Sequence, residues 1–280
     1  MILAMRTFGG MMGSLLFTIP AASVGAGEQG MQSPTSITVS SVAPDTNEAL
    51  ARLVTTVREQ ADAFVFLSGG ASNMSGEHQQ QLMSMFDALT RIAKSGRRLV
   101  VGDGGTEAGI MRAAGNARQA SGNAFILIGV APAREVPPRG KTPVDPHHSH
   151  IVAVDNPSLP ATGDAWGSET ETMYWLFDRL AAGRPSVTIV ANGGGITLNE
   201  VLANVNAGRS MIVIEGSGRA ADALASLVKK TKPAADLVDL RARAEKADLA
   251  RRPELYRFVP LSAGATGLRD ALQLSLSPRK

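Results

Sequence analysis

Arg219 is the side chain whose position most clearly suggests ligand chemistry. It follows Gly216-Ser217-Gly218, at the predicted first turn of a helix. The dipole is positive at this end of a helix, so an arginine there is unfavourable unless an anion accompanies it. A bound phosphate would supply that anion, and the planar guanidinium could hold it with two hydrogen bonds. The alternative is a structural salt bridge to Glu215 or Asp222; we expect Asp222 to orient Arg219.

Glu200 is the candidate catalytic carboxylate. It ends the segment Thr197-Leu198-Asn199-Glu200, whose Thr-x-x-Glu pattern is typical of a capping box at a helix start. We favour capping, because a carboxylate turned back to its own helix is not available as a base. An available carboxylate could instead stabilise a developing cation or activate water. Thr197 is assigned to the same site as a ligand contact.

Three histidines close together, His147, His148 and His150, raise the question of a metal site. The sequence has no cysteine, and its fourth histidine, His78, is distant in the chain. A strand that starts at His150 would turn alternate side chains to opposite faces. We therefore predict no metal, and assign His150 to hydrogen bonding or stacking on a ligand.

Trp166 is a further candidate, in the glycine-flanked loop 163–167. It could cover a planar ligand ring or close the edge of the domain, and the sequence leaves both open. The segment that follows, Ser168-Glu169-Thr170-Glu171, has the pattern of another capping box, which predicts a helix through Leu180.

Glycine-rich turns follow short apolar runs at residues 64–67, 99–101, 187–190 and 212–214. Apolar, β-branched runs of this kind are typical of buried parallel strands. Glycines let a ligand approach the backbone, and the amide groups at a following helix N-terminus favour phosphate. The predicted ligand-binding residues in these turns are Gly69, Gly70, Gly104, Gly105, Thr106, Gly109, Gly193, Gly194, Gly195, Gly216, Ser217 and Gly218.

Helical patterns alternate with these strands, which predicts an α/β fold: a Rossmann-like, doubly wound parallel sheet with helices on both faces. Ligands then bind beyond the carboxyl ends of the strands. Other strands are predicted at 125–130, 150–154 and 256–261, and helices at 46–60, 75–94, 168–180, 234–250 and 267–274, with two more starting near 197 and 219. We assign residues 46–276 to a single domain and 1–45 to an N-terminal extension, in which 36–39 could form a short strand.

The composition of the 280 residues narrows the classes of function. A hydrophobic content of 44% is sufficient for a full core, and an aromatic content of 4% makes that core aliphatic. A net charge of +3, with scattered basic residues and no basic stripe among aromatics, does not support nucleic-acid binding. The absence of cysteine excludes disulfides and a thiol nucleophile.

The N-terminal segment has several interpretations. Residues 11–24 are mostly apolar and end near small residues, as in a signal peptide that would span 1–26. This stretch is too short and too interrupted for a membrane span. Translation from Met31, or a first strand and helix of the domain, are the alternatives. We predict a cytoplasmic protein, with export as the alternative if the signal peptide is genuine.

The order of the motifs resembles a known group of proteins. The residues that carry the resemblance are the segments 104–111, 147–150, 166–169 and 192–195, and Gly216-Ser217-Gly218-Arg219-Ala220-Ala221-Asp222. They resemble the SLOG superfamily of Rossmann-like domains, and within it the prokaryotic LSDAT relatives of the cytosolic N-terminal domain of TRPM cation channels. The resemblance covers roughly residues 60–262 and implies binding or sensing of a nucleotide-derived ligand, such as ADP-ribose or NAD. It does not imply a channel, because the sequence has no apolar run of about 18 residues. We also predict no cofactor and no nucleic-acid partner.

The SLOG superfamily also includes the LOG phosphoribohydrolases, which cleave nucleotides at the N-glycosidic bond. Residues 192–200 are similar to their Pro-Gly-Gly-x-Gly-Thr-x-x-Glu motif, with Asn192 in place of the proline and Ile196 in place of the third glycine. The resemblance implies that Glu200 would work with an arginine on the preceding helix, which here carries Arg179 near its end. An N-glycosidic hydrolase, either LOG-like or NAD-cleaving, is therefore our alternative, although we favour a binding protein that is not an enzyme. A pure interaction module, and association of several copies, are also left open.

Overall fold

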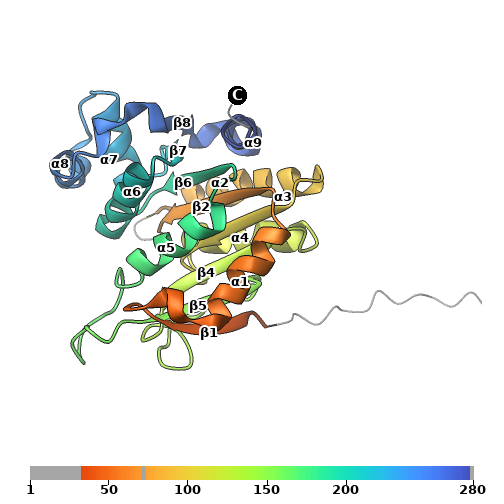
Figure 1. Ribbon diagram of the computed structural model, residues 1–280. Coiled ribbons are helices and arrows are strands. Elements are labelled where there is room, and N and C mark those ends of the chain that lie inside the picture. Colours follow the sequence, from red (N-terminus) through yellow and green to blue (C-terminus); the bar gives the residue numbers. More distant parts are fainter. Residues whose placement is uncertain (1–32, 71–73, 278–280) are drawn as a thin grey trace, which may run out of the picture. The chain divides into compact units, whose positions relative to one another are not determined.

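The core of the structure is a parallel sheet of eight strands (Figure 1). The structure is a computed structural model and describes residues 33–70 and 74–277. The strands are β1 (Thr35–Ser40), β2 (Ala63–Gly69), β3 (Leu99–Asp103), β4 (Ile126–Pro132), β5 (His150–Asp155), β6 (Ser186–Ala191), β7 (Ser210–Glu215) and β8 (Tyr256–Pro260). The predicted signal-like segment at 1–26 and the alternative start at Met31 lie outside the described residues.

The order of the strands creates a place for a ligand. Across the sheet the order is β1-β5-β4-β3-β2-β6-β7-β8, and every pair is parallel. From β2 the chain adds strands toward one edge as far as β5, and then returns to place β6 on the other side of β2. Loops on the two sides of such a switch point diverge and leave a crevice at the carboxyl ends of the strands.

Helices cover both faces of the sheet, which confirms the predicted fold class. The described α-helices are α1 (Glu48–Glu59), α2 (Gly76–Met85), α3 (Asp87–Lys94), α4 (Gly109–Ala120), α5 (Thr170–Ala181), α6 (Gly195–Ala207), α7 (Arg219–Val228), α8 (Val238–Lys246) and α9 (Gly264–Ser275). One apolar cluster joins α2, α3, α4 and α9 to one face of the sheet. Two clusters on the other face join α1 and α5, and α6, α7 and α8, to the strands. Strand residues such as Phe64 and Val65 are fully buried because helices pack on both sides.

Several predicted boundaries are wrong. The helix expected at 75–94 is two helices, which meet at Phe86, and that expected at 234–250 is a shorter α8 flanked by 3-10 turns. The capping box expected at Ser168 does not form, because α5 begins at Thr170 and Glu169 accepts from the Gly167 amide. By contrast, the short strand considered at 36–39 is confirmed as β1, which pairs with β5 at the edge of the sheet.

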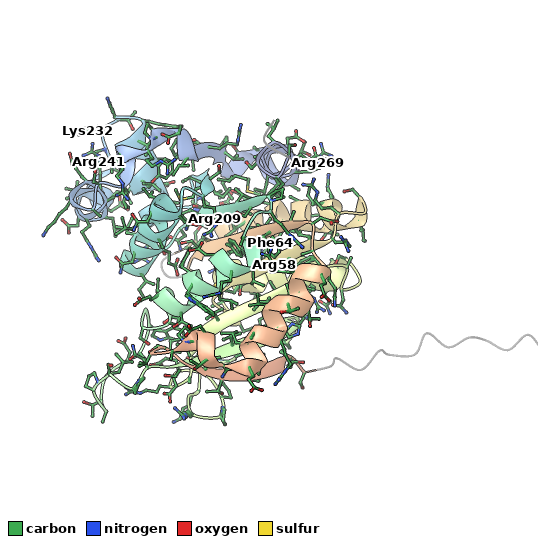
Figure 2. The ribbon with its side chains drawn as sticks, in the orientation of Figure 1. Arg58, Phe64, Arg209, Lys232, Arg241 and Arg269 are labelled. Carbon is green, nitrogen blue, oxygen red and sulfur yellow. The ribbon has the colours of Figure 1, made fainter. Side chains whose placement is uncertain are left out.

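Arg58 shows how the helices on one face are fastened together (Figure 2). Its guanidinium donates to the carbonyls of Arg179 and Leu180, at 2.7 and 2.9 Å, and to that of Ala182 at 2.9 Å. These carbonyls end α5 and have no partner within the helix, so a cation from α1 satisfies them and the helix dipole together.

Among the described residues, no helix is long and apolar enough to cross a membrane.

Candidate functional site

A cavity of about 320 Å³ lies where β2, β3 and β6 end. Its walls are built largely from the turns after these strands and from the first turns of the helices that follow. The predicted site residues that line it are Gly69, Gly70, Gly104, Thr106, Gly193, Gly194, Gly195, Thr197, Glu200 and Arg219. Leu67, Met111, Trp166, Glu169 and Ile196 line it as well. The switch point therefore brings together residues from three of the four predicted turns and Arg219, which follows the fourth.

The turn after β6 starts α6 in a way that the sequence did not predict. The helix begins at Gly195, and the Thr197 hydroxyl accepts a hydrogen bond from the Gly194 amide at 3.2 Å. Gly193 has φ +84°, and a Cβ there would lie 2.2 Å from Thr197 Oγ1. Thr197 thus caps the helix from inside its first turn, and Glu200 lies too far along to complete a capping box. Our favoured interpretation of Glu200 as a capping residue is wrong.

Glu200 is instead a buried side chain, 8% exposed, in the wall of the cavity. Its Oε2 accepts a hydrogen bond from the Ser68 hydroxyl at the end of β2. Burial raises the pKa of Glu200 to about 7, and the nearby Glu169 carboxylate adds to the rise. A carboxyl group that titrates near neutrality can hold or release a proton under physiological conditions.

A buried polar network holds the helix that carries Glu200. Asn204 Nδ2 donates to the Glu200 carbonyl at 2.8 Å and lies 3.0 Å from the Tyr174 hydroxyl. Arg209, which Figure 2 labels, donates to Asn204 Oδ1 at 2.8 Å and pairs with Asp178. Burial raises the pKa of Tyr174, so its hydroxyl stays neutral beside the carboxylate. The network fixes α6 against α5, and with it the position of Glu200.

Glu169 is a second buried carboxylate in the cavity. It lies within the segment 168–171, which was predicted to form a capping box. It is 7% exposed and lines the cavity, and its Oε2 accepts from the Gly167 amide at 2.8 Å. Burial raises the pKa of Glu169 to about 7, and the Glu135 carboxylate adds to the rise. The local pattern could not reveal this role, because the partner carboxylate on α6 is distant in the sequence.

Arg219 reaches over the N-terminus of α6. It starts α7 with φ +47°, an uncommon conformation for a residue other than glycine. A Cβ on Gly194 would lie 3.0 Å from Arg219 Nη2, so the missing side chain makes room for the guanidinium. Because the N-terminal amides of α6 are also positive, this end of the cavity favours an anion.

The turn Gly216-Ser217-Gly218 supports this arrangement but does not line the cavity among the described residues. The amides of Gly216 and Gly218 donate to the Asp222 carboxylate at 2.7 and 3.1 Å. The Ser217 hydroxyl accepts from the Asn192 amide at 2.8 Å. These groups are used within the protein, so we correct the predicted phosphate contacts here: the turn positions Arg219 and the neighbouring β6 turn. Asp222 braces the turn through the same bonds.

The turn at Gly104 rests on a buried triad of side chains. His148 Nε2 lies 2.8 Å from Asp103 Oδ1, and His148 Nδ1 lies 3.2 Å from Asp145 Oδ1. Burial alone would lower the pKa of His148, but the two carboxylates outweigh it and raise the pKa to about 9. Asp103 also accepts a hydrogen bond from the Gly105 amide at 2.7 Å, so this amide already has a partner within the protein.

The remaining predicted residues lie apart from the described lining of the cavity. Gly109 starts α4 with φ +47°. His150 is half-buried, with Nδ1 3.0 Å from Ser149 Oγ and with Arg118, from the last turn of α4, nearby. Burial and the Arg118 charge lower the pKa of His150. Among the described residues, no group of three His, Cys, Asp or Glu could hold a metal ion.

A larger but more open groove, of about 630 Å³, runs between α5 and α6. None of the predicted site residues belongs to its described lining. We place the site in the smaller cavity because the glycine turns, Arg219 and both buried carboxylates converge there.

Comparison with known proteins agrees with the observed fold. The family model described as "SLOG in TRPM, prokaryote" matches residues 62–265, which include every element around the cavity. The chain belongs to this SLOG family. No curated protein matched the sequence. Membership fits, in general terms, a role in binding a nucleotide-related ligand.

This SLOG domain departs from the LOG-like pattern at one important position. Arg179, the arginine available on α5, lies in the last turn of the helix with its guanidinium 4.4 Å from the centre of the Trp175 ring. The residue that faces the cavity from the start of α5 is Glu169. A second carboxylate therefore accompanies Glu200 in the cavity, and Arg179 does not belong to its described lining.

Proposed function

We propose that the cavity binds a nucleotide-derived ligand of the ADP-ribose or NAD kind. A phosphate group would lie against Arg219 and the N-terminus of α6, and a ribose hydroxyl would donate to Glu200. The observation that carries this proposal is the position of Arg219 over Gly194, since it joins a guanidinium to the positive end of a helix inside a cavity. Gly193 and Gly195 line the same cavity beside it.

Isothermal titration calorimetry with ADP-ribose, NAD, AMP and ribose 5-phosphate tests the proposal. We expect at least one of these phosphorylated ligands to bind with a Kd well below millimolar, and AMP to bind better than adenosine, which lacks the phosphate. If no phosphorylated ligand binds in that range, or if adenosine binds as well as AMP, the proposal is wrong.

A second candidate function, hydrolysis of the N-glycosidic bond, is favoured by the two buried carboxylates. A carboxylate at Glu200 could stabilise the positive charge that develops at C1′ of the ribose, and a carboxyl group that titrates near pH 7 could transfer a proton. Release of adenine from AMP, or of nicotinamide from NAD, would be followed by chromatography for the wild type and Glu200→Gln. This function requires activity that Glu200→Gln abolishes and that Glu171→Gln, on the exposed side of α5, retains.

A further inference from the structure

Glu169 and Glu200 present two carboxylates to the cavity, and the part of the chain that the structure describes pairs neither of them with a cation. Each is more than nine-tenths buried, and no Lys, Arg or His among the described residues forms an ion pair with either. The groups that face them are the Glu135 carboxylate, beside Glu169, and the neutral Tyr174 hydroxyl, beside Glu200. Arg209, beyond Tyr174, is engaged by Asp178 and Asn204.

Buried carboxylates are costly unless a proton or a positive charge accompanies them. The same cavity also holds Arg219, over the N-terminus of α6. The cavity therefore presents a guanidinium as well as two carboxylates. A ligand that carries a phosphate at one end and a positive charge at the other would be complementary to both.

Apolar side chains at the cavity indicate what kind of positive group would fit. Trp166 and Ile196 are 37% and 39% exposed, and both line the cavity. The backbone next to Trp166 packs on Ile196, because a Cβ on Gly167 would be 3.4 Å from Ile196 Cγ1. An exposed indole next to carboxylates suits a flat, charged ring, which it can contact through its π face. A hydrated metal ion would gain nothing from this apolar wall.

We propose that the cavity selects a nucleotide whose base carries a positive charge, such as an N-substituted pyridinium, with the ring between Trp166 and the carboxylates of Glu169 and Glu200. This inference rests on the nucleotide-binding function proposed above and names the class of base. Every nucleotide carries a phosphate that could bind at Arg219, so this contact does not distinguish one nucleotide from another. The preference for a charged base comes from the carboxylates of Glu169 and Glu200.

The test compares ligands that differ in the charge of the ring. Calorimetry at pH 8 with 1 mM EDTA would use nicotinamide mononucleotide, its reduced form with a neutral ring, and ribose 5-phosphate. We expect the oxidised nucleotide to bind about tenfold more tightly than the reduced one, and Glu169→Gln to reduce that ratio to nearly one. Glu171→Gln, an exposed substitution on the same helix, should keep the ratio.

The other outcomes separate this inference from the proposed function. If ribose 5-phosphate and both nucleotides bind with similar affinity, the nucleotide site stands and the charge selectivity is wrong. If none of the three binds but ADP-ribose or AMP does, the nucleotide site stands and the charge selectivity is wrong; if ADP-ribose, NAD and AMP fail as well, both are wrong. If the preference for the oxidised ring appears only when Mg²⁺ replaces EDTA, the carboxylates serve a metal ion, and the inference is overturned.

A spectroscopic measurement places the ring independently of affinity. Trp166 and Trp175 are the two tryptophans of the chain. In a Trp175→Phe background, Trp166 alone reports on the cavity, and the oxidised nucleotide should quench its fluorescence whereas ribose 5-phosphate should not. Equal, weak responses to the two ligands would contradict the position given to the ring.

Discussion

At Glu200, a local sequence pattern suggests one role and the structure gives the side chain other contacts. The Thr-x-x-Glu pattern is compatible with a cap or with a functional carboxylate, because both interpretations depend on where the helix begins. In the structure α6 begins at Gly195, and Glu200 turns to Ser68 on a neighbouring strand. A partner that lies far away in the sequence leaves no local signal, and the same holds for Glu169.

The raised pKa of Glu200 predicts a pH dependence of stability. The group titrates near 4.5 when unfolded and near 7 when folded, so the folded state holds its proton more tightly. Its contribution to stability is complete below pH 4.5 and is lost as the pH rises through 7. As the pH rises from 5 to 8, the free energy of unfolding of Glu200→Gln should therefore increase relative to that of the wild type, by on the order of 1–3 kcal/mol.

Urea unfolding of the wild type and Glu200→Gln at several pH values would measure this difference. Glu171→Gln, where the side chain is exposed, should follow the wild type at every pH. Parallel stability curves for Glu200→Gln and the wild type would show that Glu200 does not titrate in this range.

Arg219 allows ligand binding and stability to be measured separately. Arg219→Ala should weaken binding of AMP or ADP-ribose by about 1.5–3 kcal/mol, the usual scale for a hydrogen bond to a charged group. Arg219→Lys should restore only part of the loss, since an ammonium cannot make a forked contact. Arginine, alanine and lysine bear the same backbone strain at position 219, where φ is +47°, so the comparison isolates the effect of the side chain. A lowered Tm with unchanged affinity would assign Arg219 to structure instead.

The start of α6 is the element on which the site depends most. Gly193 and Gly194 were predicted as ligand contacts, and the structure shows what each does locally. Gly193 makes room for the capping hydroxyl of Thr197, and Gly194 makes room for Arg219. The sequence predicted that glycines would open the backbone here, but it could not show that side chains of the protein fill part of the space.

Gly194→Ala tests the packing between α6 and Arg219. The backbone at Gly194 has φ −139° and ψ −145°, outside the regions that alanine favours, and the new Cβ would lie 3.0 Å from the guanidinium. We expect weaker binding of AMP, by about threefold to tenfold, from displacement of the arginine, together with a lower Tm from the strained backbone. Gly76→Ala, where a Cβ meets nothing within 4 Å, is the matched control. Unchanged affinity in Gly194→Ala would mean that Arg219 need not occupy this position.

The His148 triad fastens the loop between β4 and β5 beneath the Gly104 turn. Removal of the imidazole would leave Asp103 and Asp145 buried together without a cation, so His148→Asn should lower the free energy of unfolding by about 3–5 kcal/mol. The contribution of His148 is complete below pH 6.5 and is lost as the pH rises through 9. Urea unfolding at pH 6.5 and 9.5 measures both effects, with His147→Asn as control. Equal losses in the two variants would contradict a role for the triad.

At the scale of the whole molecule, the fold followed from the sequence more completely than the site did. Buried strands such as β2 and β6 appear as continuous apolar runs because helices cover both faces, and their alternation with amphipathic helices predicts a parallel sheet. The order of the strands comes from long-range pairing, which no local pattern encodes. The switch point between β2 and β6, and with it the meeting of Glu169 and Glu200, therefore needed the structure.

A crystal structure of the protein with bound ADP-ribose tests the central claim most directly. We predict that a phosphate oxygen lies within hydrogen-bonding distance of the Arg219 guanidinium and of the backbone between Gly193 and Gly195, with a ribose hydroxyl at Glu200. Ligand density in the groove between α5 and α6, or against Gly216-Ser217-Gly218 with the cavity at Arg219 empty, would contradict the account.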